Sequence, residues 1–356
     1  MAADLELLDD RGGIQKADRA GMLPVVERWP EMLAQAVGFS AGVSLSPRQN
    51  IRQVVICGMG GSAIAGDIAA DMLFNKLPVP LIINRGYNLP NFVGSETLVI
   101  ALSYSGETEE TLAAVRDAEK RGAQLICISS GGKLTEIARN KKYPLFTVPA
   151  GFQPRAALPY LLVPLLLALE KAGLTTAVER ELNEVVGQLQ KLREEYGSQR
   201  PAKINPAKQL AKKLVGKIPL IFGSVGTTAA CALRLKGQLN ENSKVAAHVA
   251  LFPELDHNEI VSLAALKRED HNFSLLVLRD EGDSERIKKR IEITKSLLSR
   301  QLGGITDLSS QGKSPLAKML SLIFFGDYLS VYLALLNGID PTPVDIITRL
   351  KKELLR

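Results

Sequence analysis

The sequence predicts two α/β domains in tandem, each built on a doubly wound parallel sheet. Three observations support this fold class. Short, nearly continuous apolar runs rich in β-branched residues alternate with helical stretches, as in parallel sheets that helices cover on both faces. This pattern occurs twice along the chain. The length of 356 residues suits two domains of about 150 residues each.

The first half of the chain opens with helical sequence and continues with predicted strands. We expect an N-terminal helical segment, residues 1–50, with one helix over residues 19–37, packing on the first domain. Residues 51–174 form that domain. Its apolar runs predict strands at 54–57, 81–83, 98–102, 125–128 and 146–148. Its helices are expected at 64–75, 109–121 and 159–172.

Two turns that follow strands of the first domain have the composition of a phosphate site. The turn after the third strand reads Ser103-Tyr104-Ser105-Gly106-Glu107-Thr108. There, hydroxyls, free amides and a helix dipole converge, and Thr108 is the expected N-cap. The turn after the first strand reads Gly58-Met59-Gly60-Gly61-Ser62 and matches neither GxGxxG nor a P-loop. Both turns should face one crevice, although a capped turn without a ligand is the alternative for the serine turn alone.

A guanidinium is predicted at the same edge of the sheet. Pro154-Arg155 follows the fifth strand on a loop that Gly151 and Pro154 shape. A surface arginine is usually only a solvated charge, but this position favours a role in the crevice. Residues 175–205, rich in Glu, Gln, Lys and Arg, then predict a helical linker.

Residues 206–356 are predicted to repeat the architecture as a second domain. Strands are expected at 220–223, 245–249, 274–278 and 304–308, and helices at 228–240, 283–301 and 316–336. The turn after its first strand has fewer glycines than the turn that begins at Gly58. We therefore expect a duplicated fold whose second turn has lost the phosphate.

Composition limits the compartment and the partners. The formal net charge is +6, but acidic and basic residues interleave, which fits a small anionic substrate better than nucleic acid. Cys57, Cys127 and Cys231 lack CxxC spacing and are expected in the core of a protein from a reducing compartment. Residues 1–15 do not read as a signal peptide, and the apolar run at 161–169 is too short for a membrane span. These features predict a cytoplasmic protein with no membrane or nucleic-acid partner.

Two residues of the second half are candidates for proton transfer. Glu241 lies near the expected C-terminus of a helix, where the dipole disfavours a carboxylate. His257 lies in the segment Glu254-Leu255-Asp256-His257-Asn258, and histidine is the side chain whose charge changes near neutrality. Taken singly, an exposed charge and a surface histidine are the commoner explanations.

Together these residues resemble a known family, the bifunctional phosphoglucose/phosphomannose isomerases of the sugar isomerase (SIS) superfamily. The resemblance covers about residues 20–356 and implies two flavodoxin-like SIS domains. The serine-rich turn alone marks only the superfamily, whereas the contexts of Glu241 and His257 are more specific. The resemblance rests on both turns of the first domain and on Pro154-Arg155, Asn240-Glu241-Asn242, Glu254-Leu255-Asp256-His257-Asn258, Asp340-Pro341-Thr342-Pro343 and Leu350-Lys351.

The resemblance implies reversible isomerisation of glucose 6-phosphate and mannose 6-phosphate with fructose 6-phosphate through a cis-enediol, without a cofactor or a metal. Glu241 would move the proton between C1 and C2. Arg155 and the amides of Gly60 and Gly61 would stabilise the oxyanion. His257, assisted by Lys351, would open the sugar ring.

The resemblance also implies how the substrate is held and how the protein assembles. Thr342 would line the sugar pocket. Family members are homodimers whose active site lies between subunits, with the histidine coming from the partner chain. The phosphate would be held by Ser62, Ser103, Ser105 and Thr108.

Two other functions stay open. One is a single-specificity isomerase of a phosphosugar or an amino-sugar phosphate. The other is a non-catalytic regulator that binds a sugar phosphate; it would keep the turn from Ser103 to Thr108 but could lose Glu241. Such regulators often carry a helix-turn-helix domain, and the sequence predicts none.

Overall fold

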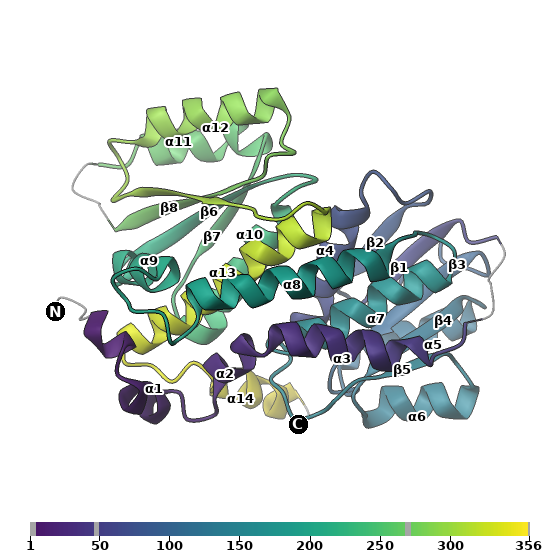
Figure 1. Ribbon diagram of the computed structural model, residues 1–356. Coiled ribbons are helices and arrows are strands. Elements are labelled where there is room, and N and C mark those ends of the chain that lie inside the picture. Colours follow the sequence, from purple (N-terminus) through teal and green to yellow (C-terminus); the bar gives the residue numbers. More distant parts are fainter. Residues whose placement is uncertain (1–4, 46–49, 268–271, 355–356) are drawn as a thin grey trace.

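The chain folds into two lobes, each with a parallel sheet (Figure 1). The computed structural model describes residues 5–45, 50–267 and 272–354. The strand order is β2-β1-β3-β4-β5 in the first lobe and β7-β6-β8-β9 in the second. In each lobe the chain therefore starts inside the sheet and winds outward in both directions, which confirms two doubly wound domains of the flavodoxin-like type.

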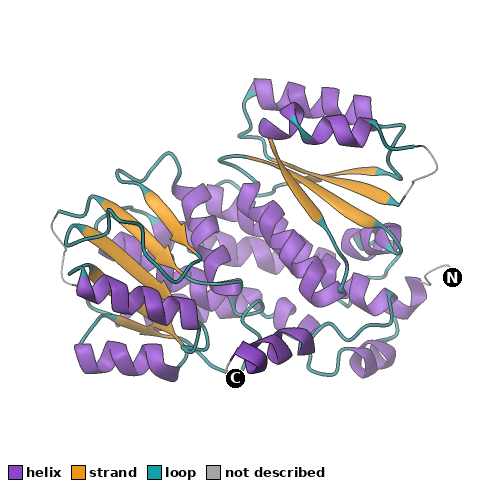
Figure 2. Ribbon diagram, turned by 180° about the vertical axis from the view of Figure 1, so that it is seen from behind, coloured by secondary structure: helices purple, strands orange, loops and turns teal. Residues whose placement is uncertain are grey.

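The first sheet is buried on both faces, as Figure 2 shows for the strands between their helices. Val54 and Ile56 of β1 belong to the core that includes α4 (Gly61–Leu73) and α7 (Leu158–Lys171). Val55 and Cys57 point to the opposite core, with α5 (Glu109–Lys120) and α6 (Gly132–Lys141). Burial on both faces explains why these strands read as continuous apolar runs. The strands are β1 (Gln53–Cys57), β2 (Leu81–Asn84), β3 (Thr97–Leu102), β4 (Gln124–Ser129) and β5 (Leu145–Thr147).

The second sheet is covered in the same way. Its outer face packs on α11 (Glu259–Ala264) and α12 (Glu285–Leu298), and its inner face on α10 (Ala229–Gln238) and α13 (Pro315–Leu336). The edge strand β7 lies at His248–Phe252 instead of the predicted 245–249. Only two of its five residues are buried, and the apolar stretch that contains it runs from 245 to 252 with only His248 interrupting it, so composition does not define where the strand begins. The strands are β6 (Ile218–Ser224), β7 (His248–Phe252), β8 (Phe273–Arg279) and β9 (Ile305–Ser309).

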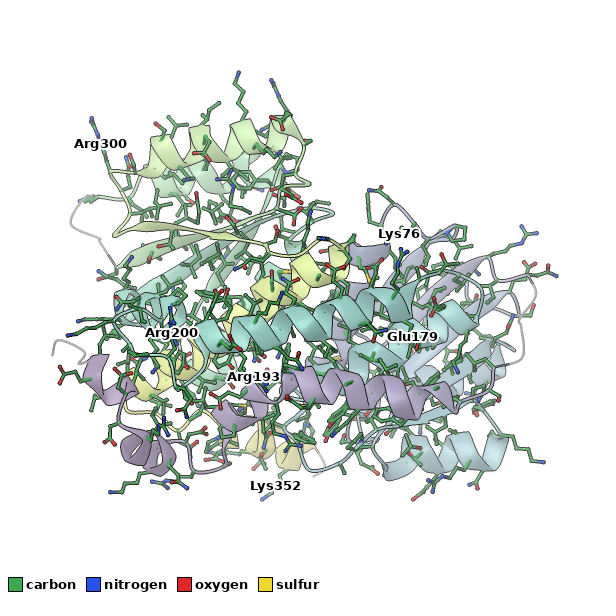
Figure 3. The ribbon with its side chains drawn as sticks, in the orientation of Figure 1. Lys76, Glu179, Arg193, Arg200, Arg300 and Lys352 are labelled. Atoms are coloured by element: carbon green, nitrogen blue, oxygen red, sulfur yellow. The ribbon has the colours of Figure 1, made fainter. Side chains whose placement is uncertain are left out.

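A layer of long helices joins the lobes. The core helix α13 contacts α8 (Val178–Tyr196), α9 (Pro206–Leu214) and α10. Among the described residues α13 alone is long and apolar enough to cross a membrane, and 89% of its apolar stretch is buried inside the protein. The predicted linker contains α8, which buries Leu182, Val185 and Leu189 in this layer. Arg193, labelled on α8 in Figure 3, also donates to Glu31 of α3 (Trp29–Ala41) at 2.8 Å.

The N-terminal segment differs from its prediction in the division of its helix and in the lobes that it contacts. The single helix expected over residues 19–37 is wrong, because α2 (Met22–Glu27) and α3 meet at Arg28. Pro30 lacks an amide hydrogen, so it starts a new helix and cannot continue the preceding one. The segment contacts both lobes, since α3 packs on α7 while α2 and the 3₁₀ turn η1 (Leu5–Leu8) pack on α13; α1 (Arg11–Ala17) lies between η1 and α2.

The three cysteines are buried and unpaired, as the sequence predicts. Burial raises the pKa of Cys57 and of Cys127 to about 12. These thiols are therefore protonated at neutral pH and behave as small apolar side chains.

Candidate active site

The glycine turn after β1 lies against the loop that carries Arg155. Gly60 has a φ of +51°, a conformation that suits glycine. A Cβ on Gly61 would lie 2.6 Å from the carbonyl oxygen of Pro154. Gly61 therefore lets the start of α4 approach the backbone next to Arg155.

The serine turn after β3 is held by its own hydroxyl groups. Ser103 is buried and donates to the Thr108 hydroxyl at 2.9 Å. Thr108 stands at the N-cap of α5, as predicted, but its side chain makes no capping hydrogen bond to the helix. The Ser62 hydroxyl accepts from the amide of Tyr104 at 3.3 Å, which ties the two turns together. Ser105 is exposed at the tip of the turn.

A second glycine-rich loop, which the sequence reasoning missed, supports the serine turn. Gly131 and Gly132 follow β4, and a Cβ on Gly106 would overlap the carbonyl oxygen of Gly131. Glu107 accepts from the amide of Lys133 at 2.9 Å. The signal was the run Ser129-Ser130-Gly131-Gly132 at a strand end, the same kind of signal as the first two turns.

Arg155 lies between the lobes and is only 2% exposed. Its Nε donates to the Asn242 side chain at 2.6 Å, and its Nη2 donates to the carbonyls of Pro341 and Thr342 at 2.9 and 2.7 Å. Its Nη1 lies 3.5 Å from Oε2 of Glu241. Burial lowers the pKa of Arg155, and the charge of Glu241 opposes this shift.

A buried ion pair holds the backbone of Arg155. Arg234 of α10 donates to the Arg155 carbonyl at 2.6 Å and to Asp327 of α13 at 2.7 Å. Ser330, one turn after Asp327, accepts from Asn242 at 2.9 Å. The sequence reasoning missed these residues. Asp327 and Ser330 were readable as polar positions in an otherwise apolar helix.

Glu241 lies in a π-helical turn, η2 (Leu239–Ser243), that continues α10. Such wide turns often occur at functional sites. Lys244 ends the turn with a φ of +54° and donates to the carbonyls of Glu241 and Pro341 at 2.9 and 3.0 Å. This second cation, also missed, offsets the negative end of the helix beside the Glu241 carboxylate. Burial and the nearby Arg155 lower the pKa of Lys244.

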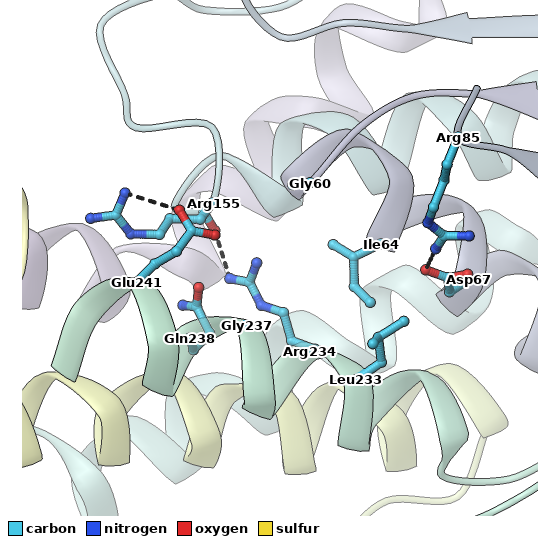
Figure 4. Close-up of a pocket in the computed structure, with 11 residues that line it drawn as sticks. Gly60, Ile64, Asp67, Arg85, Arg155, Leu233, Arg234, Gly237, Gln238 and Glu241 are labelled. Atoms are coloured by element: carbon cyan, nitrogen blue, oxygen red, sulfur yellow. Dashed lines mark hydrogen bonds and ion pairs between the residues drawn. The ribbon is translucent and has the colours of Figure 1, made fainter. Parts of the chain in front are cut away.

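These groups line a pocket of about 190 Å³ between α4 and α10. Figure 4 shows Arg155 and Glu241 at one end and the paired Arg85 and Asp67 at the other. The side chain of Glu241 is 33% exposed. The glycine turn, Arg155 and Glu241 therefore meet in one pocket, and the hydroxyl groups of the serine turn lie outside its lining.

The remaining predicted residues lie outside the pocket lining, Thr342 next to Arg155 and the other two at the surface. The Thr342 carbonyl touches Arg155, and the Thr342 hydroxyl is buried without a partner among the described residues. His257, at the end of the 3₁₀ turn η3 (Glu254–His257), is exposed. Lys351, on α14 (Asp345–Leu354), is also exposed. Neither residue lines the pocket. Across residues 5–45, 50–267 and 272–354, no cluster of three or more His, Cys, Asp or Glu could hold a metal.

The fold and these two turns define a protein of two SIS domains. Residues 48–150 match the SIS domain family, and residues 203–354 match the family described as the bacterial phospho-glucose isomerase C-terminal SIS domain. A solved putative phosphosugar isomerase from Clostridium difficile has the same fold. The two sequences are 17% identical. The structures superpose with a TM-score of 0.71, over 93% of this chain and 97% of the other.

Relatives that are similar over nearly the whole chain identify the family. The chain is 45% identical to a bifunctional phosphoglucose/phosphomannose isomerase from Caldicellulosiruptor bescii, over 94% of this chain and 98% of the relative. It therefore belongs to the bifunctional phosphoglucose/phosphomannose isomerase family, which confirms the resemblance seen in the sequence. It is also 30% identical to a D-glucosamine-6-phosphate 4-epimerase from Sulfolobus acidocaldarius, over 93% of this chain and 97% of the relative.

Replacing Gly106 with Ala should disrupt the serine turn. Gly106 and Gly122 share a φ of +71°, but the space around Gly122 is open. We expect Gly122→Ala to lower the free energy of unfolding by about 1 kcal/mol, the cost of the left-handed conformation. Gly106→Ala should cost roughly 3 kcal/mol or more, because the backbone of Gly131 must also move. Urea denaturation measures both values, and equal losses would contradict this account of the loop contact.

Proposed function

We propose that the protein interconverts glucose 6-phosphate and mannose 6-phosphate with fructose 6-phosphate. The observation that carries this proposal is the pairing of Glu241, from the second lobe, with Arg155, from the first. They lie 3.5 Å apart in a pocket that the glycine turn also lines. A base beside a fixed cation and backbone amides is the arrangement that an enediol intermediate requires.

In the proposed reaction, Glu241 takes the C2 proton of the open-chain aldose. The electron pair forms the C1–C2 double bond, and the carbonyl oxygen at C1 gains negative charge that Arg155 and the amides at Gly60 and Gly61 stabilise. The hydroxyl proton at O2 passes to O1, and the Glu241 carboxyl returns its proton to C1, leaving the ketose. Thr342 would lie beside the sugar, because its carbonyl accepts from Arg155, which lines the pocket.

The phosphate would bind at the turns of the first lobe. Ser105 is the exposed hydroxyl of the serine turn, and the side chain of Thr108 does not cap α5, so the first amides of that helix can serve an anion. Ser62 and Ser103 would hold the turn in place around the same site, through their hydrogen bonds with Tyr104 and Thr108. Holding the phosphate here would place C1 and C2 against Glu241.

A second subunit would complete the site. His257 and Lys351 are both exposed and lie away from the pocket lining. In addition, α14 buries no residue and presents Ile346, Leu350 and Leu354 on one face at helical spacing. An uncovered apolar face of this kind suits contact with another chain. We therefore propose a cytoplasmic homodimer in which His257 reaches the pocket of the partner subunit and opens the sugar ring.

The second candidate is a reaction on an amino-sugar phosphate. The relative named a D-glucosamine-6-phosphate 4-epimerase favours it, because its similarity to this chain also extends over nearly the full length. The isomerase is the better supported of the two, because the nearer relative carries that name and Glu241 pairs with a cation suited to an enediolate.

Replacing Glu241 with Gln should strongly reduce turnover while leaving binding nearly unchanged. The amide cannot accept the proton, so we expect kcat to fall by about 10²- to 10⁴-fold with little change in phosphosugar affinity. A coupled assay and isothermal titration calorimetry measure the two quantities. Glu285→Gln, on the exposed surface of α12, is the matched control and should keep full activity. A Glu241→Gln variant as active as this control would rule out the assigned base.

Purified protein supplied with fructose 6-phosphate should form both glucose 6-phosphate and mannose 6-phosphate. The two products are followed separately, with and without a chelator. We expect equal rates in both conditions, because every proposed catalytic group is a side chain or a backbone amide. Formation of a single product would contradict the proposed dual specificity. Loss of activity in the chelator would contradict the proposed metal-free mechanism. Conversion of glucosamine 6-phosphate alone would favour the second candidate.

Mixing two inactive variants tests the proposed subunit arrangement. Glu241→Gln and His257→Asn should each be inactive as homodimers. In a heterodimer, one pocket would combine the intact Glu241 of one chain with the intact His257 of the other. Random pairing after co-refolding should then restore about a quarter of wild-type activity. If both residues act within one chain, the mixture stays inactive, and refolded wild type is the control for recovery.

A further inference from the structure

The helices α4 and α10 occupy equivalent places in the two lobes. Each follows the strand at which its sheet begins, β1 or β6, and that strand has a neighbour on both sides. The start of α4 opens onto the reaction pocket through Gly60 and Gly61. The start of α10 would be the corresponding anion position of the second lobe.

A carboxylate from the other lobe occupies that position. Oδ2 of Asp71, near the end of α4, accepts from the amide of Ala230 in the first turn of α10 at 2.7 Å. The residue at the N-cap, Thr228, does not cap the helix, and its hydroxyl accepts from the amide of Ser224 at 2.8 Å. Asp71 therefore accepts a hydrogen bond from a free amide at the start of α10, as a capping side chain or a bound anion would.

The cavity beside this contact is lined by the protein's own charged groups. A second pocket, of about 220 Å³, is lined by Asp71 and Thr227 together with three lysines. Thr227 donates to Asp283 at 2.7 Å. Lys76 pairs with Glu181 at 2.8 Å, and Lys318 with Glu281 at 2.6 Å. The contact at Asp71 thus lies beside ion pairs and hydrogen bonds that the chain makes with itself, at a partly exposed junction of the two lobes.

The two helices run in opposite directions, and together they form the walls of the reaction pocket. Asp71 at the end of α4 meets Ala230 at the start of α10, while Gly61 at the start of α4 shares the pocket with Glu241 beyond the end of α10. Helical rise puts roughly 15 Å between Gly61 and Asp71 and roughly 16 Å between Ala230 and Glu241. Because these two lengths are nearly equal, the bond from Ala230 to Asp71 at one end of the helix pair places Glu241 opposite the glycine turn at the other end.

We propose that Asp71 is a positioning residue for the isomerisation proposed above. Its carboxylate takes the place of an anion at the start of α10 and fixes the register of α10 on α4, and hence the place of Glu241 opposite Gly60 and Gly61. This inference rests on the proposed function only for its activity readout.

The test compares kcat, KM and Tm of four proteins: wild type, Asp71→Ala, Asp71→Asn and Ser284→Ala. Asp71→Ala should lower kcat about tenfold, because a shift of Glu241 spoils its approach to the substrate. KM should change less than about threefold, since the proposed phosphate site lies in the first lobe. Asp71→Asn should keep kcat within about threefold of wild type, because its amide oxygen still accepts from Ala230. Ser284→Ala removes the cap of the outer helix α12 and should lower Tm alone.

Each other outcome overturns a defined claim. If Asp71→Ala lowers Tm as Ser284→Ala does but keeps kcat, Asp71 is only a helix cap. If Asp71→Asn loses as much kcat as Asp71→Ala, the bond to Ala230 is not the cause. Should Asp71→Ala not fold, Asp71→Ser, whose hydroxyl is too short to reach Ala230, replaces it. A wild type without isomerase activity refutes the proposed function, whereas an active wild type with an equally active Asp71→Ala refutes the inference on Asp71 alone.

Discussion

Burial of the Arg155 guanidinium is the constraint on which the arrangement of the two lobes depends. A charge that is almost fully removed from water must be hydrogen-bonded and paired, or the fold pays a large desolvation cost. The acceptors for Arg155 come from Asn242, Glu241 and the carbonyls at Pro341 and Thr342. These groups belong to the π-helical turn and to the segment after α13. Satisfying one cation therefore gathers two distant parts of the second lobe at the edge of the first sheet.

The same arrangement explains how a carboxylate persists at the end of a helix. The dipole of α10 opposes a negative charge at Glu241, and the wide turn of η2 leaves carbonyl groups to be satisfied. Lys244 binds those carbonyls, and Arg155 faces the carboxylate itself. The two cations thus stabilise a local charge that the helix alone would disfavour. Glu241 can remain partly exposed to the pocket, where a substrate would reach it.

The parts that could be predicted from the sequence are those that local chemistry determines. Strands such as β1 and β3 are buried on both faces, so each reads as an apolar run. The edge strand β7 and the break at Arg28 depend on packing and on one proline, and their predicted bounds were wrong. In the site, Glu241 and Arg155 stand in recognisable motifs. Their supporting residues, Arg234 and Lys244, could not be identified, because their partners are distant in the chain or bind through carbonyls that no motif shows.

The difference between the two lobes follows from which glycines each turn retains. Counting from the first glycine of each turn, Gly60 corresponds to Val225. Gly60 opens onto the pocket, whereas the amide of Val225 donates to the Phe252 carbonyl at 3.1 Å. Gly223 and Gly226 remain because the backbone needs them: a Cβ on Gly223 would lie 2.9 Å from the Thr228 carbonyl oxygen, and Gly226 has a φ of +83°. The second lobe thus has the glycines that its backbone requires and no glycine at the position of Gly60, and its helix α10 carries Glu241 to the pocket that Gly60 lines.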